Sequence, residues 1–170
     1  QWDSPGEIVW RPTPEQAEKT RAREIQEQLL PKEYPPMPGW EVAHLYKPAG
    51  DVGGDYLDVF QVDAGRVGFI VGDVSGKGYS AAMVMVMVRS AFRMATAGIA
   101  LARDAAWRVN RLVSPDVKKG MFITLGYGCL DVPSGRFSLV NCAHNPPFHY
   151  AARTKAVRDQ GGVGRANLLA

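Results

Sequence analysis

The chain has 170 residues, of which 46% are hydrophobic and 22% are charged, and its formal net charge is +3. This length and apolar share predict one globular domain with its own core. No apolar run is long enough to span a bilayer and no secretion signal opens the chain, so we expect a cytoplasmic protein without a membrane partner. Two cysteines, Cys129 and Cys142, are too few for a disulfide framework or a zinc site, and we expect both to be buried.

Charge is divided unevenly along the chain. Residues 1–76 contain 7 Lys+Arg and 13 Asp+Glu, whereas residues 77–170 contain 13 Lys+Arg and 4 Asp+Glu. The basic residues of the second part are scattered, without a Lys/Arg run or interleaved aromatic residues, which argues against nucleic-acid binding. A solvated basic face, or a face for an anionic protein partner, is the expected reading.

Residues 1–36 are expected to form an extended lead-in and a linker helix, followed by a folded domain at 37–170. A threonine cap, a proline and an acidic residue favour a helix that begins after Thr13 and ends before Pro31. Because polar residues dominate this helix at 15–30, it is either a solvated linker or a helix that couples an upstream sensor domain or partner, or pairs in a homodimer.

The remaining elements are predicted from periodicity and turn residues. The helix expected at 80–97 begins at a Ser80 cap and ends at Gly98, with its methionines in the core. In the next helix, Trp107, Val109 and Leu112 are expected to face inward. In chain order the elements are a strand at 40–46, a hairpin of 55–62 with 66–73, helices at 80–97 and 102–113, and a hairpin of 121–132 with 136–140; nothing definite is predicted after residue 150.

The first hairpin brings two acidic residues together. Its turn at 63–65 ends in the glycine expected of a three-residue loop. If Val62 lies opposite Arg66, counting outward sets Asp55 opposite Asp73. Two adjacent carboxylates repel each other unless a cation or a proton lies between them. The sequence therefore predicts a divalent metal site at this end of the hairpin.

Alternation places both aspartates on one face of this hairpin. The other face carries two glycines, so the aspartate-bearing face is the more apolar, and we expect it to form the core. Asp58 lies on the opposite face and is either a direct or water-mediated metal ligand or a structural hydrogen-bonding residue. The predicted core residues are Leu57, Val59, Val67, Phe69 and Val71.

The loop at 72–78, with the sequence GDVSGKG, resembles a phosphate cradle, because glycines allow backbone N–H groups to point at an anion. It does not match a nucleotide-binding P-loop. The spacing from Gly72 to Gly76 is one residue too short, and Gly78 stands where a magnesium-binding hydroxyl is needed. A plain glycine turn without a ligand remains the alternative.

Four stretches, in the family's order, resemble the bacterial branch of the PPM metal-dependent protein phosphatases, typified by the stage II sporulation E protein and the sigma-factor regulatory phosphatases. In chain order they are QEQLLP at 26–31, GGDYLD at 53–58, GDVSGKG at 72–78 and NCAHNPP at 141–147. The resemblance implies an α+β fold, with a β-sandwich of two antiparallel sheets flanked by helices. It also implies a serine/threonine phosphatase that acts on a phosphorylated regulatory protein of the anti-sigma-factor antagonist type.

The resemblance also assigns roles to single residues. Asp55 and Asp73 would bind two Mn²⁺ or Mg²⁺ ions, with Asp73 bridging them, and the backbone carbonyl of Val74 would be a further ligand. Eukaryotic relatives carry a histidine where this chain has Ser75, so either another residue protonates the leaving group or its protonation matters less. The candidate contacts to phosphate or substrate are Ser75, Gly76, Lys77 and His144; structural roles are the alternative for Lys77 and His144.

The family's last third carries two further metal-binding aspartates, the first in an Asp-Gly motif. After Asp73 this chain has four acidic residues, none in a matching context: Asp104, Asp116, Asp131 and Asp159. We therefore expect the domain at 37–170 to be incomplete at its C-terminal end and to bind metal weakly. A non-catalytic regulatory module with the same fold is the alternative function.

Overall fold

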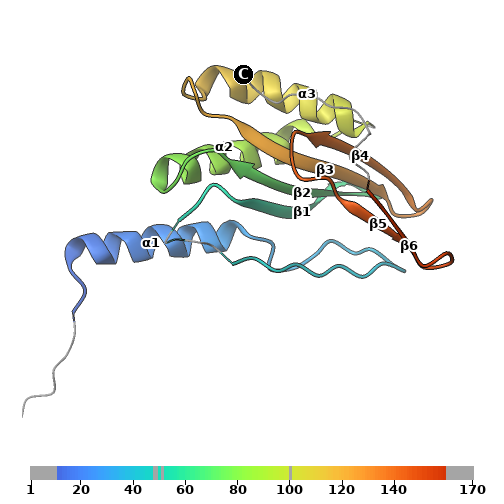
Figure 1. The fold of residues 1–170 in the computed structure, drawn as a ribbon, viewed down its shortest axis with the longest axis horizontal. Coiled ribbons are helices and arrows are strands. Elements are labelled where there is room, and N and C mark those ends of the chain that lie inside the picture. Colours follow the sequence, from blue (N-terminus) through green and yellow to red (C-terminus); the bar gives the residue numbers. More distant parts are fainter. Residues whose placement is uncertain (1–10, 48–49, 51, 100, 160–170) are drawn as a thin grey trace, which may run out of the picture.

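The computed structural model describes residues 11–47, 50, 52–99 and 101–159, so the expected lead-in at 1–10 lies outside the described residues. The predicted helices and both predicted hairpins are present within a few residues of their expected positions (Figure 1). The helices are α1 (Pro14–Leu29), α2 (Tyr79–Ala95) and α3 (Ala102–Val113), followed by a short 3-10 turn at Ser114–Asp116, and the strands are β1 (Tyr56–Asp63), β2 (Arg66–Val74), β3 (Ile123–Asp131), β4 (Arg136–Cys142), β5 (Phe148–Ala151) and β6 (Ala156–Asp159).

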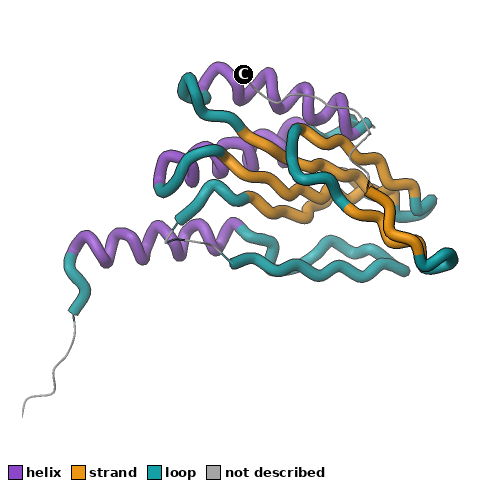
Figure 2. Tube along the Cα trace, viewed as in Figure 1, coloured by secondary structure: helices purple, strands orange, loops and turns teal. Residues whose placement is uncertain are grey.

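The strands form two antiparallel sheets, one of four strands in the order β1-β2-β3-β4 and one made of β5 and β6. Helix α2 packs over β1 and β2, while α3 packs over β3 and β4, so both helices cover one face of the larger sheet (Figure 2). The class is therefore α+β with two antiparallel sheets and helices, as the resemblance implied. Within the described ranges, none of the helices is both long enough and apolar enough to cross a membrane.

The core lies between these helices and the face of the sheet opposite to the one predicted. Tyr56, Phe60 and Ile70 contact buried residues of α2 and α3. Ile70 is 1% exposed, whereas Val71, assigned to the core by alternation, is 51% exposed. Two of the residues predicted as core, Val59 and Val67, are buried nevertheless, so the sheet is not fully open on its other face.

Two glycines explain why counting apolar residues selected the wrong face. A Cβ atom on Gly68 would lie 3.0 Å from Cζ of Phe60 and 3.2 Å from Cε2 of Tyr127, and one on Gly72 would lie 2.9 Å from Cβ of Leu125. Large side chains thus pack directly over bare backbone. The glycines mark the densely packed face, although they reduce its apparent hydrophobicity.

The predicted register of the first hairpin is confirmed along most of its length. Tyr56 pairs with Gly72 and Gln61 pairs with Val67, as the count outward required. At the turn the prediction is wrong, because Asp63 and not Val62 pairs with Arg66, and the register shifts between Gln61 and Asp63. Asp63 forms an ion pair with Arg66 and accepts a hydrogen bond from the Gly65 N–H at 3.3 Å, which stabilises a tighter turn.

Helix α1 begins as predicted. Thr13 is its N-cap, and Oγ1 of Thr13 accepts a hydrogen bond from the Gln16 N–H at 3.2 Å. Oε1 of Gln16 accepts one from the Thr13 N–H at 2.8 Å, which completes a capping box. The loop that follows contains no strand at 40–46, so that prediction is wrong (Figure 2). Leu45 in this loop is 91% exposed, so its side chain is not packed against a sheet.

Helix α2 departs from prediction at its start and in its methionines. Gly78 is the N-cap and no side chain caps the helix, so the expected Ser80 cap is wrong. Met85 is buried in the core, but Met83 and Met94 are exposed, so the methionines fill the core only in part.

Helix α3 packs on the sheet through small residues. Val109 faces inward as predicted, but Trp107 and Leu112 are 58% and 56% exposed, so the prediction is wrong for both. Small side chains allow the helix to lie close to the sheet, which leaves no room for an indole ring. The buried residues of α3 are Ala102, Ala105, Ala106, Val109 and Val113.

Candidate metal centre

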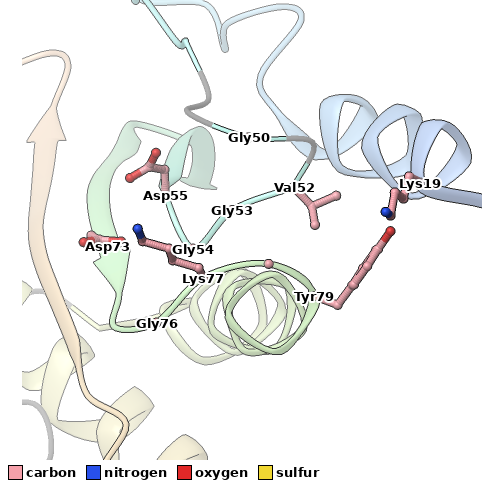
Figure 3. A pocket seen from close by; sticks show the side chains of 11 residues that line it. Lys19, Gly50, Val52, Gly53, Gly54, Asp55, Asp73, Gly76, Lys77 and Tyr79 are labelled. Carbon is pink, nitrogen blue, oxygen red and sulfur yellow. The ribbon is translucent and has the colours of Figure 1, made fainter. Parts of the chain in front are cut away.

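Asp55 and Asp73 lie side by side at one end of the first hairpin. The ladder between β1 and β2 ends at the pair Tyr56 and Gly72, so the two aspartates are the next residues outward. Both are exposed, and both line an open pocket of about 440 Å³ (Figure 3). The structure thus brings together the two residues that the hairpin count selected. The pocket is also lined by Lys19, Gly50, Val52, Gly53, Gly54, Gly76, Lys77, Gly78 and Tyr79.

The electrostatics of this pair favour a bound cation. Burial and the negative charge of Asp55 raise the pKa of Asp73, while the charge of His144 partly offsets this increase. No lysine or arginine of the described chain forms an ion pair with either aspartate. A positive ion between the carboxylates would relieve their repulsion.

The backbone around the aspartates leaves no space for a side chain at one position. The Val74 N–H donates a hydrogen bond to the Gly54 carbonyl at 3.2 Å, which joins the start of β1 to the end of β2. A Cβ atom on Gly54 would lie 2.4 Å from the Val74 carbonyl oxygen. Only glycine allows this close approach, which brings the Val74 carbonyl next to the segment that carries Asp55.

The glycine loop after β2 turns back toward this pocket. Gly76 and Gly78 have φ angles of +106° and +70°, in the left-handed region that favours glycine. Because Gly78 caps α2 and lines the pocket, the positive N-terminal end of α2 lies at the same opening. Figure 3 shows the Lys77 side chain on the same side of the pocket as Asp55 and Asp73, whereas Tyr79 lies at the other end.

Ser75 is held by a reciprocal pair of hydrogen bonds. Its N–H donates to the Phe122 carbonyl at 2.8 Å, and its Oγ accepts from the Phe122 N–H at 2.8 Å. These bonds fasten the glycine loop to the segment just before β3.

His144 is half-buried at the neighbouring end of β4. Its Nδ1 lies 2.9 Å from Oγ1 of Thr124, and its backbone is held by Asn141, whose Oδ1 accepts from the His144 N–H at 2.8 Å. Burial lowers the pKa of His144, while the charges of Asp73 and Asp55 act in the opposite direction. His144 lines the adjacent pocket, yet it interacts electrostatically with both aspartates.

Asp58 has a structural environment. It is 0% exposed, and its two oxygens accept hydrogen bonds from Nε and Nη2 of Arg93, each at 2.7 Å. Nε of Arg89 lies 3.8 Å from Oδ2, and the Tyr56 hydroxyl donates to Oδ2 at 3.2 Å. Of the two readings left open by the sequence, the hydrogen-bonding one fits this environment.

Gln26 belongs to the stretch at 26–31 that carries part of the resemblance, but its contact with the aspartate segment was not predicted from the sequence. Its Nε2 donates to the Gly53 carbonyl at 2.7 Å and its Oε1 accepts from the Gly53 N–H at 3.0 Å, two residues before Asp55. Close by, Nε of Arg89 donates to the Leu29 carbonyl at 3.0 Å. Gln26 is the buried residue of α1, and its place at the start of the stretch at 26–31 was the sequence signal that could have marked it as more than a solvated residue.

The donor set fits part of a magnesium or manganese shell. The described residues contain no group of three or more His, Cys, Asp or Glu side chains that could hold a metal ion. Asp55, Asp73 and the Val74 carbonyl offer only oxygen atoms, which hard divalent cations prefer. Mg²⁺ is commonly bound through one or two carboxylates, with water and substrate phosphate completing its coordination.

Fold and site together define a phosphatase-like domain, and comparison with known proteins identifies the family. The chain belongs to the stage II sporulation protein E (SpoIIE) family, whose characteristic sequence pattern matches residues 63–165. The resemblance drawn from the four motifs is therefore confirmed.

Three curated relatives are similar over much of this chain. It is 28% identical over 143 residues to phosphoserine phosphatase RsbU of Bacillus subtilis, which covers 84% of this chain and 42% of RsbU. It is 28% identical over 158 residues to protein IcfG of Synechocystis, a match that covers 77% of this chain and 25% of IcfG. It is 26% identical over 110 residues to phosphoserine phosphatase RsbP of Bacillus subtilis, a match that covers 62% of this chain and 27% of RsbP. The chain thus spans less than half the length of each of these relatives.

Two solved structures have a similar fold. The RsbU and RsbW domains of a Mycobacterium tuberculosis protein match with a TM-score of 0.60 and 32% identity, over 72% of this chain and 34% of that one. The PP2C phosphatase domain of SpoIIE from Bacillus subtilis, solved with a fragment of its regulatory domain, matches with a TM-score of 0.58 over 75% of this chain and 36% of that one. The identity to the second is 19%, so this likeness shows the fold alone.

Proposed function

We propose that this chain is part of a metal-dependent serine/threonine phosphatase that hydrolyses phosphoserine or phosphothreonine on a regulatory partner protein. The observation that carries the proposal is the placement of Asp55 and Asp73 side by side in an open pocket, next to a glycine loop. The names of RsbU and RsbP, both phosphoserine phosphatases, support the same class of reaction.

In this proposal Asp55, Asp73 and the Val74 carbonyl would hold the Mn²⁺ or Mg²⁺ ions, of which two are expected. Such ions, when bound, supply a water of lowered pKa and neutralise charge on the phosphoryl oxygens. Lys77 and the N-terminal N–H groups of α2 attract the phosphate dianion to the pocket mouth. Because the pocket is open, it admits a phosphorylated side chain that a protein loop presents.

A proton for the leaving group requires a further residue. A serine hydroxyl is too weak an acid to replace the histidine, and Oγ of Ser75 is held by the Phe122 N–H, so we assign this role to His144. Its ring is fixed by Thr124 and it interacts electrostatically with both aspartates. Because a proton donor acts only in its protonated form, replacing His144 by glutamine should lower the rate and remove the alkaline limb of the pH–rate profile, while Mn²⁺ binding is retained.

The proposed partner is an anti-sigma-factor antagonist in its phosphorylated form, and the proposed input is a sensor domain that acts through α1. The contacts of Gln26 with Gly53 support such an input, because they connect α1 directly to the backbone that carries Asp55. Two α1 helices could also pair in a homodimer. We propose the cytoplasm as the location, because free buried cysteines are typical of a reducing compartment.

A second candidate function is a non-catalytic regulatory module with the same fold. The observation that favours it is that the described residues bring two acidic side chains to the site and no third. Calorimetric titration of the full-length protein with Mn²⁺ separates the candidates: an absence of heat at millimolar metal supports the regulatory module, and saturable heat supports the enzyme.

The decisive test uses the full-length protein with an aryl phosphate as substrate. Asp73→Asn should lower Mn²⁺-dependent kcat/KM by about 100-fold or more, because it removes half of the carboxylate pair. Asp116→Asn is the matched control, since Asp116 is exposed on the turn after α3, and it should leave the rate unchanged. Undiminished hydrolysis by Asp73→Asn would contradict the proposed function.

A further inference from the structure

The outer face of α3 carries side chains that the fold does not use. Trp107 and Leu112 are exposed, and with three charged neighbours they line a hollow of about 580 Å³. We call this set the α3 surface. It consists of Asp104, Trp107, Arg108, Arg111 and Leu112.

The indole ring of this surface is held in place by its own helix. The Arg111 guanidinium lies 5.0 Å from the centre of the Trp107 ring, one helical turn away. This stacking restricts both side chains before any partner arrives. A surface whose side chains are already ordered loses less conformational entropy on binding.

The core does not account for Trp107. The inner face of α3 is complete with alanines and valines, all of them buried. A single exposed apolar residue is ordinary on a protein surface. A tryptophan stacked with an arginine and flanked by a leucine is less ordinary, because Trp and Arg are the residue types that carry most of the energy at protein interfaces.

Charge indicates the kind of partner. Arg108 and Arg111 are exposed, and neither forms an ion pair with a carboxylate of the described residues. The chain from residue 77 onward is strongly basic as well. Such a surface attracts a negatively charged partner.

We propose that the α3 surface binds an acidic segment of a partner protein. Carboxylates of the segment pair with Arg108 and Arg111, and an apolar side chain of the segment packs on Trp107 and Leu112. A nucleic acid fits less well, because the exposed basic residues do not form a run with interleaved aromatic side chains and Asp104 of this surface is already paired with Arg103 at 3.3 Å.

This surface is separate from the aspartate pair. Helix α3 lies on the helical layer and packs over β3 and β4, while Asp55 and Asp73 end the hairpin of β1 and β2 (Figure 1). The inference therefore goes beyond the proposed phosphatase function and does not depend on it.

The test uses two fluorescent peptides of equal length and the folded chain. One peptide is built from glutamate, alanine and leucine, and the second replaces every glutamate by glutamine. Fluorescence anisotropy should show saturable binding of the acidic peptide and at least about 10-fold weaker binding of the neutral one, and the affinity should fall as salt is raised.

Three variants then locate the site. Trp107→Ala and Arg111→Glu should each weaken binding of the acidic peptide by about 10-fold or more. Arg153→Glu makes the same charge change at an exposed turn between β5 and β6, away from α3, and should leave affinity nearly unchanged. All three positions are exposed, so thermal melts should confirm that the variants fold.

Each other outcome would overturn the proposal. Equal binding of both peptides would show that the glutamates do not contribute to binding. If Arg153→Glu weakened binding as much as Arg111→Glu, the peptide would be attracted by the overall positive charge and not by the α3 surface. Tighter α3-dependent binding of an oligonucleotide would identify a different class of partner. Self-association that Trp107→Ala abolishes in sedimentation, without peptide binding, would identify a second copy of the chain as the occupant.

Discussion

The structure places carboxylates in two contrasting environments at the start of β1. Asp58 points into the helix-packed core, is fully buried, and is bound by Arg93 with help from Arg89 and Tyr56. Three residues earlier, Asp55 lies exposed beside Asp73, and the described chain supplies neither with an ion-pair partner. The same residue type therefore serves stability at one position and is available for chemistry at the other.

This contrast separates a structural acid from the two for which we propose a function. A buried carboxylate is tolerated when its lone pairs are satisfied by cationic donors, which makes it part of the core. A pair of carboxylates that repel each other in an open pocket is held there by the surrounding fold and gains from an added cation. Four substitutions should test this difference, in decreasing order of their effect on stability.

The largest effect is expected from Asp58→Asn. The substitution removes the charge that pairs with Arg93 and Arg89, and it leaves donors of both arginines without a carboxylate. We expect the free energy of unfolding to fall by about 3 kcal/mol, measured by urea denaturation.

Asp63→Asn is the matched control, because Asp63 also pairs with an arginine but is only half-buried at a turn. Its loss should be below about 1 kcal/mol. Equal losses in the two variants would mean that burial does not distinguish these carboxylates.

The next effect concerns the backbone beneath the aspartate pair. Gly54→Ala would place a Cβ atom 2.4 Å from the Val74 carbonyl oxygen, so the end of β2 must shift. We expect about 2–3 kcal/mol of destabilisation and loss of Mn²⁺ binding by calorimetry. Gly53→Ala meets nothing closer than 3.9 Å and should change stability by less than about 1 kcal/mol. Similar behaviour of the two variants would refute the close-packing argument.

Gln26→Ala should have a smaller effect on stability. It removes two hydrogen bonds to the Gly53 backbone, whose groups then lack partners beside Asp55. A loss of about 1–2 kcal/mol is expected, with faster amide exchange at Gly53 in hydrogen-exchange measurements. Gln28→Ala changes an exposed residue of the same helix and should affect neither stability nor amide exchange at Gly53. If exchange at Gly53 were as fast in Gln28→Ala as in Gln26→Ala, the proposed connection between Gln26 and Gly53 would be wrong.

The smallest effect, of opposite sign, is expected from Asp73→Asn in metal-free protein. Burial and Asp55 raise the pKa of Asp73, so its ionised form is unfavourable in the fold. The variant should be more stable by about 0.2–0.5 kcal/mol at neutral pH, because solvent screens exposed charges. This gain should shrink as the pH falls through the raised pKa, since the folded state then takes up the proton first. If thermal melts show that Asp73→Asn is less stable than the unchanged protein, the Asp73 carboxylate stabilises the fold and the prediction is wrong.

The hairpin and its register could be predicted from the sequence because turn residues and counting suffice. The Ala64-Gly65 turn and a period of two placed Asp55 next to Asp73, even though the turn itself is one residue tighter than expected. The assignment of these aspartates to metal ions, and the division of the chain at residue 37, remain predictions.

The faces of the sheet and of α3 could not be predicted, because packing does not follow hydrophobicity alone. Gly68 and Gly72 lie on the core face because Phe60 and Leu125 occupy the space above them. Trp107 lies outside because small residues suit the close contact of α3 with the sheet. The contact of Gln26 with Gly53 could not be predicted either, because the two residues lie 27 positions apart in the sequence.

The buried thiols offer a practical consequence. Cys129 on β3 and Cys142 on β4 are both free and buried, as predicted, and burial raises the pKa of Cys142 to about 12. A native molecule should therefore resist alkylating reagents until β3 and β4 come apart. The rate of thiol labelling then reports how often this sheet opens. Unfolding can therefore be followed with the native cysteines, without introducing new ones.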